Sequence, residues 1–171
     1  MKPFPAAMPP PGTDLTFITE KMMAEAIALS RKSPRKRIIL PFHKEDGNTL
    51  HRMFNVVQPG SYIRPHHHKK ANKCESIIVL RGSICYLSFS EYGKIQNFQK
   101  LTAGSPIFGV DSEPHIIHSF YALEEDTVVF EVKPGPYDPA IDKDFAVWSP
   151  EEGTPEAEIY LQSLRQLTKV A

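Results

Sequence analysis

The sequence contains few cysteines, no excess of charge of either sign and no long apolar run. Its 171 residues include two cysteines, Cys74 and Cys85, and twenty basic residues balance twenty acidic ones. Balanced charge argues against recruitment of nucleic acid or of an anionic membrane surface. No apolar stretch approaches the roughly 18–20 residues that a transmembrane helix needs, and the start, MKPFPAAMPPPGT, lacks the apolar core of a secretory signal. We therefore expect a cytoplasmic protein with free thiols and no nucleic-acid or membrane partner.

The composition, 41% hydrophobic and 23% charged, is typical of a globular protein, and the length suits one domain. Within that domain the sequence pattern changes three times. The expected segments are an extended proline-rich arm over 1–13, a helix and basic loop over 14–36, a β-barrel over 37–133, and a C-terminal wrap with a last helix over 134–171.

Apolar residues at helical spacing predict helices over 14–30 and 154–168. Pro34 ends the first helix and lies within a basic run, RKSPRKR. This run is either a solvated loop or a phosphate-binding patch, and the neutral charge of the chain favours the loop.

The centre of the chain instead alternates polar and apolar residues between short turn signals. No stretch there is long enough for a crossover helix, so the pattern predicts an antiparallel sandwich or barrel. The predicted strands cover residues 37–43, 51–58, 61–68, 75–82, 83–90, 95–102, 105–111, 115–123 and 127–133. The proline-rich stretch that follows carries Tyr137, Phe145 and Trp148, which indicates a segment anchored across the barrel.

Three consecutive histidines lie in one of the predicted strands. Successive side chains of a strand point to opposite faces. His66 and His68 therefore share a face with Tyr62 and Arg64, and His67 points away. Two imidazoles placed two residues apart on one face can chelate a metal ion.

A metal site needs further ligands, and two candidates follow in the chain. Glu75 opens an apolar strand, where a buried carboxylate without a partner is costly. A cation held by His66 and His68 would be that partner. His118 lies in another short strand. Together the four residues indicate a mononuclear metal site rather than four unrelated solvated or hydrogen-bonded groups.

The spacing from Gly60 to Gly82 resembles the first motif of the cupin superfamily, G-x5-H-x-H-x(3–4)-E-x6-G. The gap between the second histidine and the glutamate is longer here, an enlarged turn with the sequence KKANKC. Residues 113–118, EPHIIH, resemble the second motif. His115 stands where that motif usually has glycine, and the closing asparagine is absent.

Longer stretches resemble the WbuC family of cupin-fold metalloproteins: HRMFNVVQPGSYIRPHHH, ESIIVLRGSI and FEVKPGPYDPAIDKDFAVWSPEEG. The resemblance implies an all-β fold, a cupin-type antiparallel β-barrel or jelly roll with an N-terminal helix and a C-terminal helix. It also implies a homodimer formed through strands and exchanged N-terminal segments. It does not imply a settled reaction.

By this resemblance the metal ligands are His66, His68, Glu75 and His118. Three imidazoles and a carboxylate suit one divalent ion, which would be Zn, Fe, Mn, Ni or Co. An octahedral ion held by these four groups keeps two positions for water, substrate or O2, and it could act as a Lewis acid or an O2-activating centre.

Three other side chains are candidates for the pocket. Tyr62 and Arg64 share the ligand face, and Arg64 could bind a carboxylate or phosphate; alternatively, both are rim residues. Asn55 could hydrogen-bond to a metal ligand.

The remaining histidines and the first cysteine are expected to lie outside the site. We expect His115 in an exposed turn, Cys74 facing away from the metal, and His43 and His51 in solvated or loop positions.

Three functions remain open from the sequence. The first is a metal-dependent enzyme, an isomerase, epimerase or dioxygenase acting on a small polar and possibly sugar-derived molecule. The second is a non-catalytic module that binds or senses a small ligand through the metal. The third is a structural metal, which the absence of thiolates among the ligands disfavours.

Overall fold

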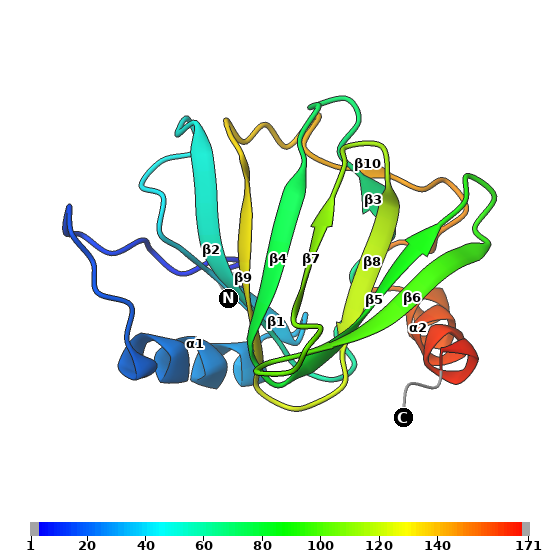
Figure 1. Ribbon diagram of the computed structural model, residues 1–171, viewed down its shortest axis with the longest axis horizontal. Coiled ribbons are helices and arrows are strands. Elements are labelled where there is room, and N and C mark those ends of the chain that lie inside the picture. Colours follow the sequence, from blue (N-terminus) through cyan, green and yellow to red (C-terminus); the bar gives the residue numbers. More distant parts are fainter. Residues whose placement is uncertain (1–3, 169–171) are drawn as a thin grey trace.

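The chain folds into two antiparallel five-stranded sheets that face each other, with one helix outside each sheet (Figure 1). The structure is a computed structural model and describes residues 4–168. The first sheet has the order β1 (Arg37–Pro41), β2 (Leu50–Val57), β9 (Thr127–Pro134), β4 (Glu75–Arg81), β7 (Gly109–Ser112). The second has the order β10 (Asp144–Phe145), β3 (His66–His67), β8 (Ile117–Ala122), β5 (Ser83–Phe89), β6 (Ile95–Thr102). The predicted all-β architecture with two helices is confirmed.

The two helices cover the outer faces of the sheets. Helix α1 (Glu20–Lys32) buries Ala26 and Ile27 against outward-facing side chains of the first sheet such as Phe54. Helix α2 (Pro155–Leu167) buries Leu161 and Leu164 in the same way against the second sheet. Neither helix, nor any other within the described residues, is long and apolar enough to span a membrane.

Helix α1 begins six residues later than the sequence predicts. The Thr19 side chain accepts a hydrogen bond from the Met22 backbone N–H, which caps the helix at that point. The preceding residues include Thr16, Phe17 and Ile18, whose restricted side chains give them modest helix propensity. The predicted helix start at residue 14 is therefore wrong, whereas α2 lies within its predicted range.

The histidine strand is much shorter than predicted. Pairing is confined to His66 and His67, because Pro65 has no N–H to donate to a sheet. His67 and His66 pair with the two residues of β10, a strand that the sequence did not predict. The division of the chain into four segments is not decided by these elements and stays a prediction.

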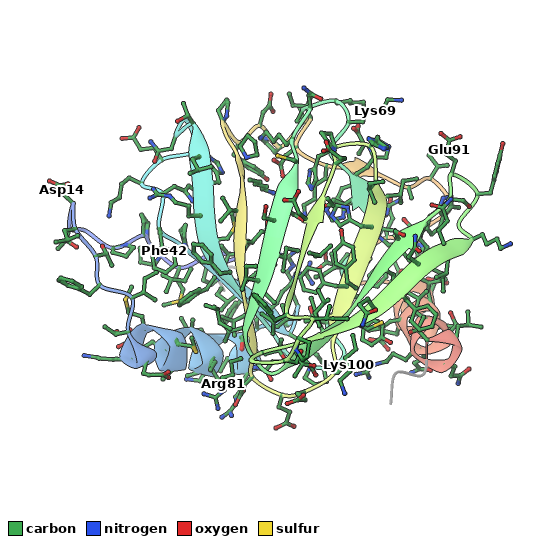
Figure 2. All side chains as sticks on the ribbon, in the orientation of Figure 1. Asp14, Phe42, Lys69, Arg81, Glu91 and Lys100 are labelled. Carbon is green, nitrogen blue, oxygen red and sulfur yellow. The ribbon has the colours of Figure 1, made fainter. Side chains whose placement is uncertain are left out.

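The space between the sheets is apolar at one end and polar at the other. Along the central strands, inward-facing residues of the apolar core give way to residues that line a cavity: Val57 to Asn55 in β2, Val129 to Glu131 in β9, Ile77 to Glu75 in β4, and Phe120 to His118 in β8. Lys69 lies at the polar end, and Arg81 and Lys100 lie at the opposite end (Figure 2). The fold thus concentrates its buried polar chemistry at one end of the barrel.

An ion pair between α1 and the turn before β9 makes stability depend on pH. Arg31 donates to Asp126 through Nε at 2.9 Å, and Gln58 donates to the same carboxylate at 3.0 Å. The Arg31 hydrogen bond, supported by Gln58, holds the pKa of Asp126 below its ordinary value although burial acts in the other direction. The unfolded chain therefore binds a proton at this site at a higher pH, about 3.9, than the folded chain does.

We expect Asp126→Asn to destabilise the protein at pH 7 and to remove part of its sensitivity to acid. The stabilisation from the Asp126 carboxylate is present above pH 4 and is lost as pH falls through the folded-state pKa. The difference in unfolding free energy between parent and variant, measured by urea denaturation, should therefore shrink between about pH 5 and pH 3. Asp14→Asn, an exposed control, should show no such change; a difference for Asp126→Asn that is constant with pH would contradict this account.

Candidate metal centre

The polar end of the barrel encloses a cavity of about 520 Å³. Residues from both sheets line it, and two other parts of the chain complete the wall. The N-terminal segment contributes Ala6 and Ala7, held beside β1 by a hydrogen bond from the Met8 N–H to the Ile39 carbonyl at 2.7 Å. Residues 136–145, here called the crossing segment, pass over the upper end of the sheets (Figure 1, orange).

Three histidines converge on one point of this cavity wall. One ring nitrogen each of His66, His68 and His118 lies within 4.8 Å of those of the other two, and all three residues are buried. They come from neighbouring strands, since His66 in β3 pairs directly with His118 in β8. Strand alternation places His68 on the same side as His66, as predicted.

The other nitrogen of each ring is fixed by the backbone. Nδ1 of His66 lies 2.8 Å from the Arg64 carbonyl, and Nδ1 of His118 lies 2.9 Å from the Ile116 carbonyl. Nδ1 of His68 contacts the carbonyl of Asp142. A carbonyl oxygen can only accept, so Nδ1 carries the proton in each ring and Nε2 has a free lone pair.

Glu75 faces these lone pairs. Its carboxylate oxygens lie 3.6 Å from Nε2 of His68 and 3.2 Å from Nε2 of His118. Both nitrogen atoms are buried and have no hydrogen-bond partner among residues 4–168. Lone pairs that face a carboxylate repel it, and a cation between them would turn this repulsion into coordination.

The ionisation of the groups also suits a cation. Burial, together with the nearby Lys143 ammonium, holds the pKa of His66 well below its ordinary value, so its imidazole is neutral. Burial alone would raise the pKa of Glu75, but the pKa lies well below its usual range, and the Lys133 ammonium is one of the groups that favour the ionised carboxylate. Neutral imidazoles and an ionised carboxylate are the forms that bind metal, and the arrangement fits the donor set of a mononuclear divalent ion.

A buried charged network stands behind the histidines. The Asp142 carboxylate receives Lys73 and Lys133, each at 3.1 Å. Lys133 also lies 3.7 Å from Glu131, which accepts a hydrogen bond from Asn55 at 3.3 Å. Burial and the neighbouring Glu75 raise the pKa of Glu131. Since the backbone of Asp142 holds His68, this network supports the orientation of a candidate ligand.

The structure brings two of the three other pocket candidates to the cavity. Asn55 and Arg64 line it, but Tyr62 does not. The Tyr62 ring packs against Tyr160 of α2, and its hydroxyl donates to the Pro150 carbonyl at 3.1 Å. The expectation that Tyr62 shares the ligand face fails because the backbone before His66 is not a regular strand, so alternation does not extend that far.

Of the residues expected to lie outside the site, three do so and two do not. His67 lies 3.3 Å from Asp144, on the side away from the other two histidines, and Cys74 and His115 are exposed. His43 and His51, however, are not solvated. Both are buried, line the cavity and stack on each other with ring centroids 4.0 Å apart.

Sequence reasoning missed several cavity residues, notably Glu131, Lys133 and Lys143. A signal was present for the first two: charged residues at alternate positions of an otherwise apolar strand, TVVFEVK, occupy its inward face. No strand pattern surrounds Lys143, whose position depends on the path of the crossing segment.

The basic run at the end of α1 is largely exposed, as expected of a solvated loop, but two of its arginines are engaged. Arg35 and Arg37 both pair with Glu152, at 2.7 and 2.6 Å, and both line the cavity. The run therefore ties the region after α1 to the C-terminal tail.

Comparisons with known proteins identify the fold. A family model described as a domain of unknown function (DUF6016) matches residues 18–101, which include His66, His68 and Glu75 but not His118. No curated protein matches the sequence. Among solved structures, the L-ribose isomerase of Cellulomonas parahominis is 18% identical, with a TM-score of 0.53 over 68% of this chain and 72% of its own.

A mutant L-ribose isomerase of Acinetobacter sp. DL28, solved with L-ribose, is also 18% identical, with a TM-score of 0.51 over 71% of this chain and 73% of its own. These proteins have the cupin fold, and the expected cupin-type fold is thereby confirmed.

Proposed function

We propose that the chain is a metalloprotein that binds one divalent ion through His66, His68, Glu75 and His118. The observation that carries the proposal is the convergence of three histidine ring nitrogens beside the Glu75 carboxylate inside a cavity, with Nε2 of His68 and of His118 buried and without a hydrogen-bond partner among the described residues. The metal is Zn, Fe, Mn, Ni or Co, and a bound ion would polarise a carbonyl or hydroxyl group of a molecule in the cavity. Residues of this chain would exclude water from that molecule and orient it.

The reaction that we propose is isomerisation or epimerisation of a small polar molecule of the sugar type. A cavity of about 520 Å³ suits a ligand of that size. The L-ribose isomerases that share the fold indicate which compounds to test first, namely aldoses and the corresponding ketoses. Dioxygenase chemistry and metal-dependent ligand binding without turnover are the alternatives.

Elemental analysis of untagged protein tests the metal, and isotope exchange tests the reaction. We expect about one divalent ion per chain, retained after exhaustive dialysis. Incubation with aldoses in D2O should then place deuterium beside the carbonyl carbon, visible by proton NMR. Oxygen consumption without exchange would favour the dioxygenase, and binding without either would favour a sensing module. Absence of metal, with no uptake on reconstitution, would overturn the proposal.

We also propose membership of the WbuC family and assembly as a homodimer in the cytoplasm. The family assignment is supported by the tail sequence, whose residues line the cavity and whose Glu152 pairs with Arg35 and Arg37. The dimer is supported by the exposed side chains Leu15, Phe17 and Ile18 before α1. The free thiols of Cys74 and Cys85 support a reducing compartment.

A further inference from the structure

The basic side chains that line the cavity fall into two groups. Arg35, Arg37 and Lys133 are neutralised within the protein, the first two by Glu152 and the third by Asp142. The other two lining cations, Arg64 and Lys143, have no comparable partner. Three of the lining carboxylates, those of Glu131, Asp142 and Glu152, form these ion pairs. Glu75 belongs to the proposed metal centre, and Asp46 lies beside His51 and Tyr137.

Lys143 is the clearer case. Among residues 4–168 it forms no ion pair and donates no hydrogen bond, although it lines the cavity. It follows Asp142, whose carbonyl holds His68, and it precedes β10, which pairs with β3 at His66. The crossing segment therefore places an unpaired ammonium group next to the metal centre.

The carboxylates of Glu131 and Glu75 act on Lys143 electrostatically but form no ion pair with it, because they face Lys133 and His118 instead. Its side chain is exposed to solvent through the cavity. The density of protein around it, together with the Lys133 ammonium, lowers the pKa of Lys143. A cation that lines a cavity and has no ion-pair partner is available to a charged ligand. A bound anion would supply that partner.

Arg64 lines the same cavity and is held in place by two contacts. Its Nε donates to the Ser149 hydroxyl at 3.1 Å, and its guanidinium carbon lies 5.0 Å from the centre of the Phe145 ring. Its nearest carboxylate, that of Glu151, is 3.9 Å away and 78% exposed, so it neutralises the guanidinium weakly. The Nη groups remain available for a planar, two-point contact with an anion.

We propose that the natural ligand carries a carboxylate or phosphate group, which Lys143 and Arg64 bind while the polar remainder reaches the metal centre. The part of this inference that concerns the metal rests on the proposed function; the anion contact itself does not. The ligand class is thus a sugar acid or a sugar phosphate and not a neutral sugar.

Isothermal titration calorimetry with three probes that share one ring tests this: D-glucose, D-glucuronate and D-glucose 6-phosphate. Both anions should bind the parent at least about tenfold more tightly than glucose, the effect of one charged hydrogen bond. Lys143→Met and Arg64→Met should each weaken anion binding by about tenfold or more and leave glucose binding within about twofold. Lys32→Met, an exposed lysine of α1, is the matched control and should change nothing.

The relative affinities of glucuronate and glucose 6-phosphate decide between carboxylate and phosphate. Anions that bind the parent no more tightly than glucose, or an anion preference that survives in both cavity variants, would overturn the inference. Metal content is measured on the same samples. Protein without metal would overturn the proposed function, and the comparison of probes in the metal-free cavity would still decide on the anion contact.

Discussion

Replacing His68 by alanine is expected to lower the affinity for a divalent metal by more than about 100-fold, since losing a ligand costs more than losing a group that orients one. His68 points Nε2 at Glu75, and the Asp142 carbonyl fixes its ring. His66→Ala should act in the same direction. Competition with a chromogenic chelator measures the affinity, with Zn²⁺ as the probe.

His67→Ala is the matched control, because it removes the same side chain one position away. His67 lies on the opposite side of the strand, beside Asp144, with a quarter of its side chain exposed. Its loss should leave the metal affinity within about twofold of the parent, since a distant surface change perturbs a site little. Equal losses for His67→Ala and His68→Ala would contradict the assignment of ligands by strand alternation.

Replacing Asp142 by alanine is expected to reduce the unfolding free energy of the metal-free protein by about 3–5 kcal/mol. The substitution removes the carboxylate that Lys73 and Lys133 share, and all three side chains are less than 8% exposed. Two buried ammonium groups would lose their common partner. Urea denaturation monitored by tryptophan fluorescence measures the change.

Asp14→Ala gives the reference for this experiment. Asp14 is exposed and lies at the left edge of the view in Figure 2, whereas the crossing segment passes over the top in Figure 1. Its replacement should change stability by less than about 0.5 kcal/mol, as is usual for surface positions. If Asp142→Ala cost no more than that, water would have to solvate both lysines, and the network could not support His68.

The fold and the histidines could be predicted because each depends on a local pattern. Period-two alternation located nine of the ten strands, and alternation within the histidine triplet placed His66 and His68 on one face. These patterns reflect a backbone geometry that each short stretch imposes on its own side chains.

The surroundings of the candidate metal centre could not be predicted in the same way. Asp142, Lys143 and β10 lie in a stretch whose path is set by contacts with residues far away in sequence, such as the pairing of Phe145 with His66. For Tyr62, strand alternation predicts the wrong face, because the backbone before His66, up to and including Pro65, is not a strand. The burial of His43 and His51 is not predicted either, because their rings stack only once the end of β1 lies beside the start of β2.

The path of the crossing segment has a thermodynamic consequence. Two adjacent residues of this segment contact different groups. The carbonyl of Asp142 contacts the His68 ring, and the side chain of Lys143 lines the cavity. A ligand that immobilises Lys143 therefore also steadies the carbonyl that aims His68. Linkage then requires reciprocity: the factor by which the ligand tightens metal binding equals the factor by which the metal tightens ligand binding. The affinities of the protein for the metal alone and for the ligand alone would therefore understate the stability of the complex that contains both.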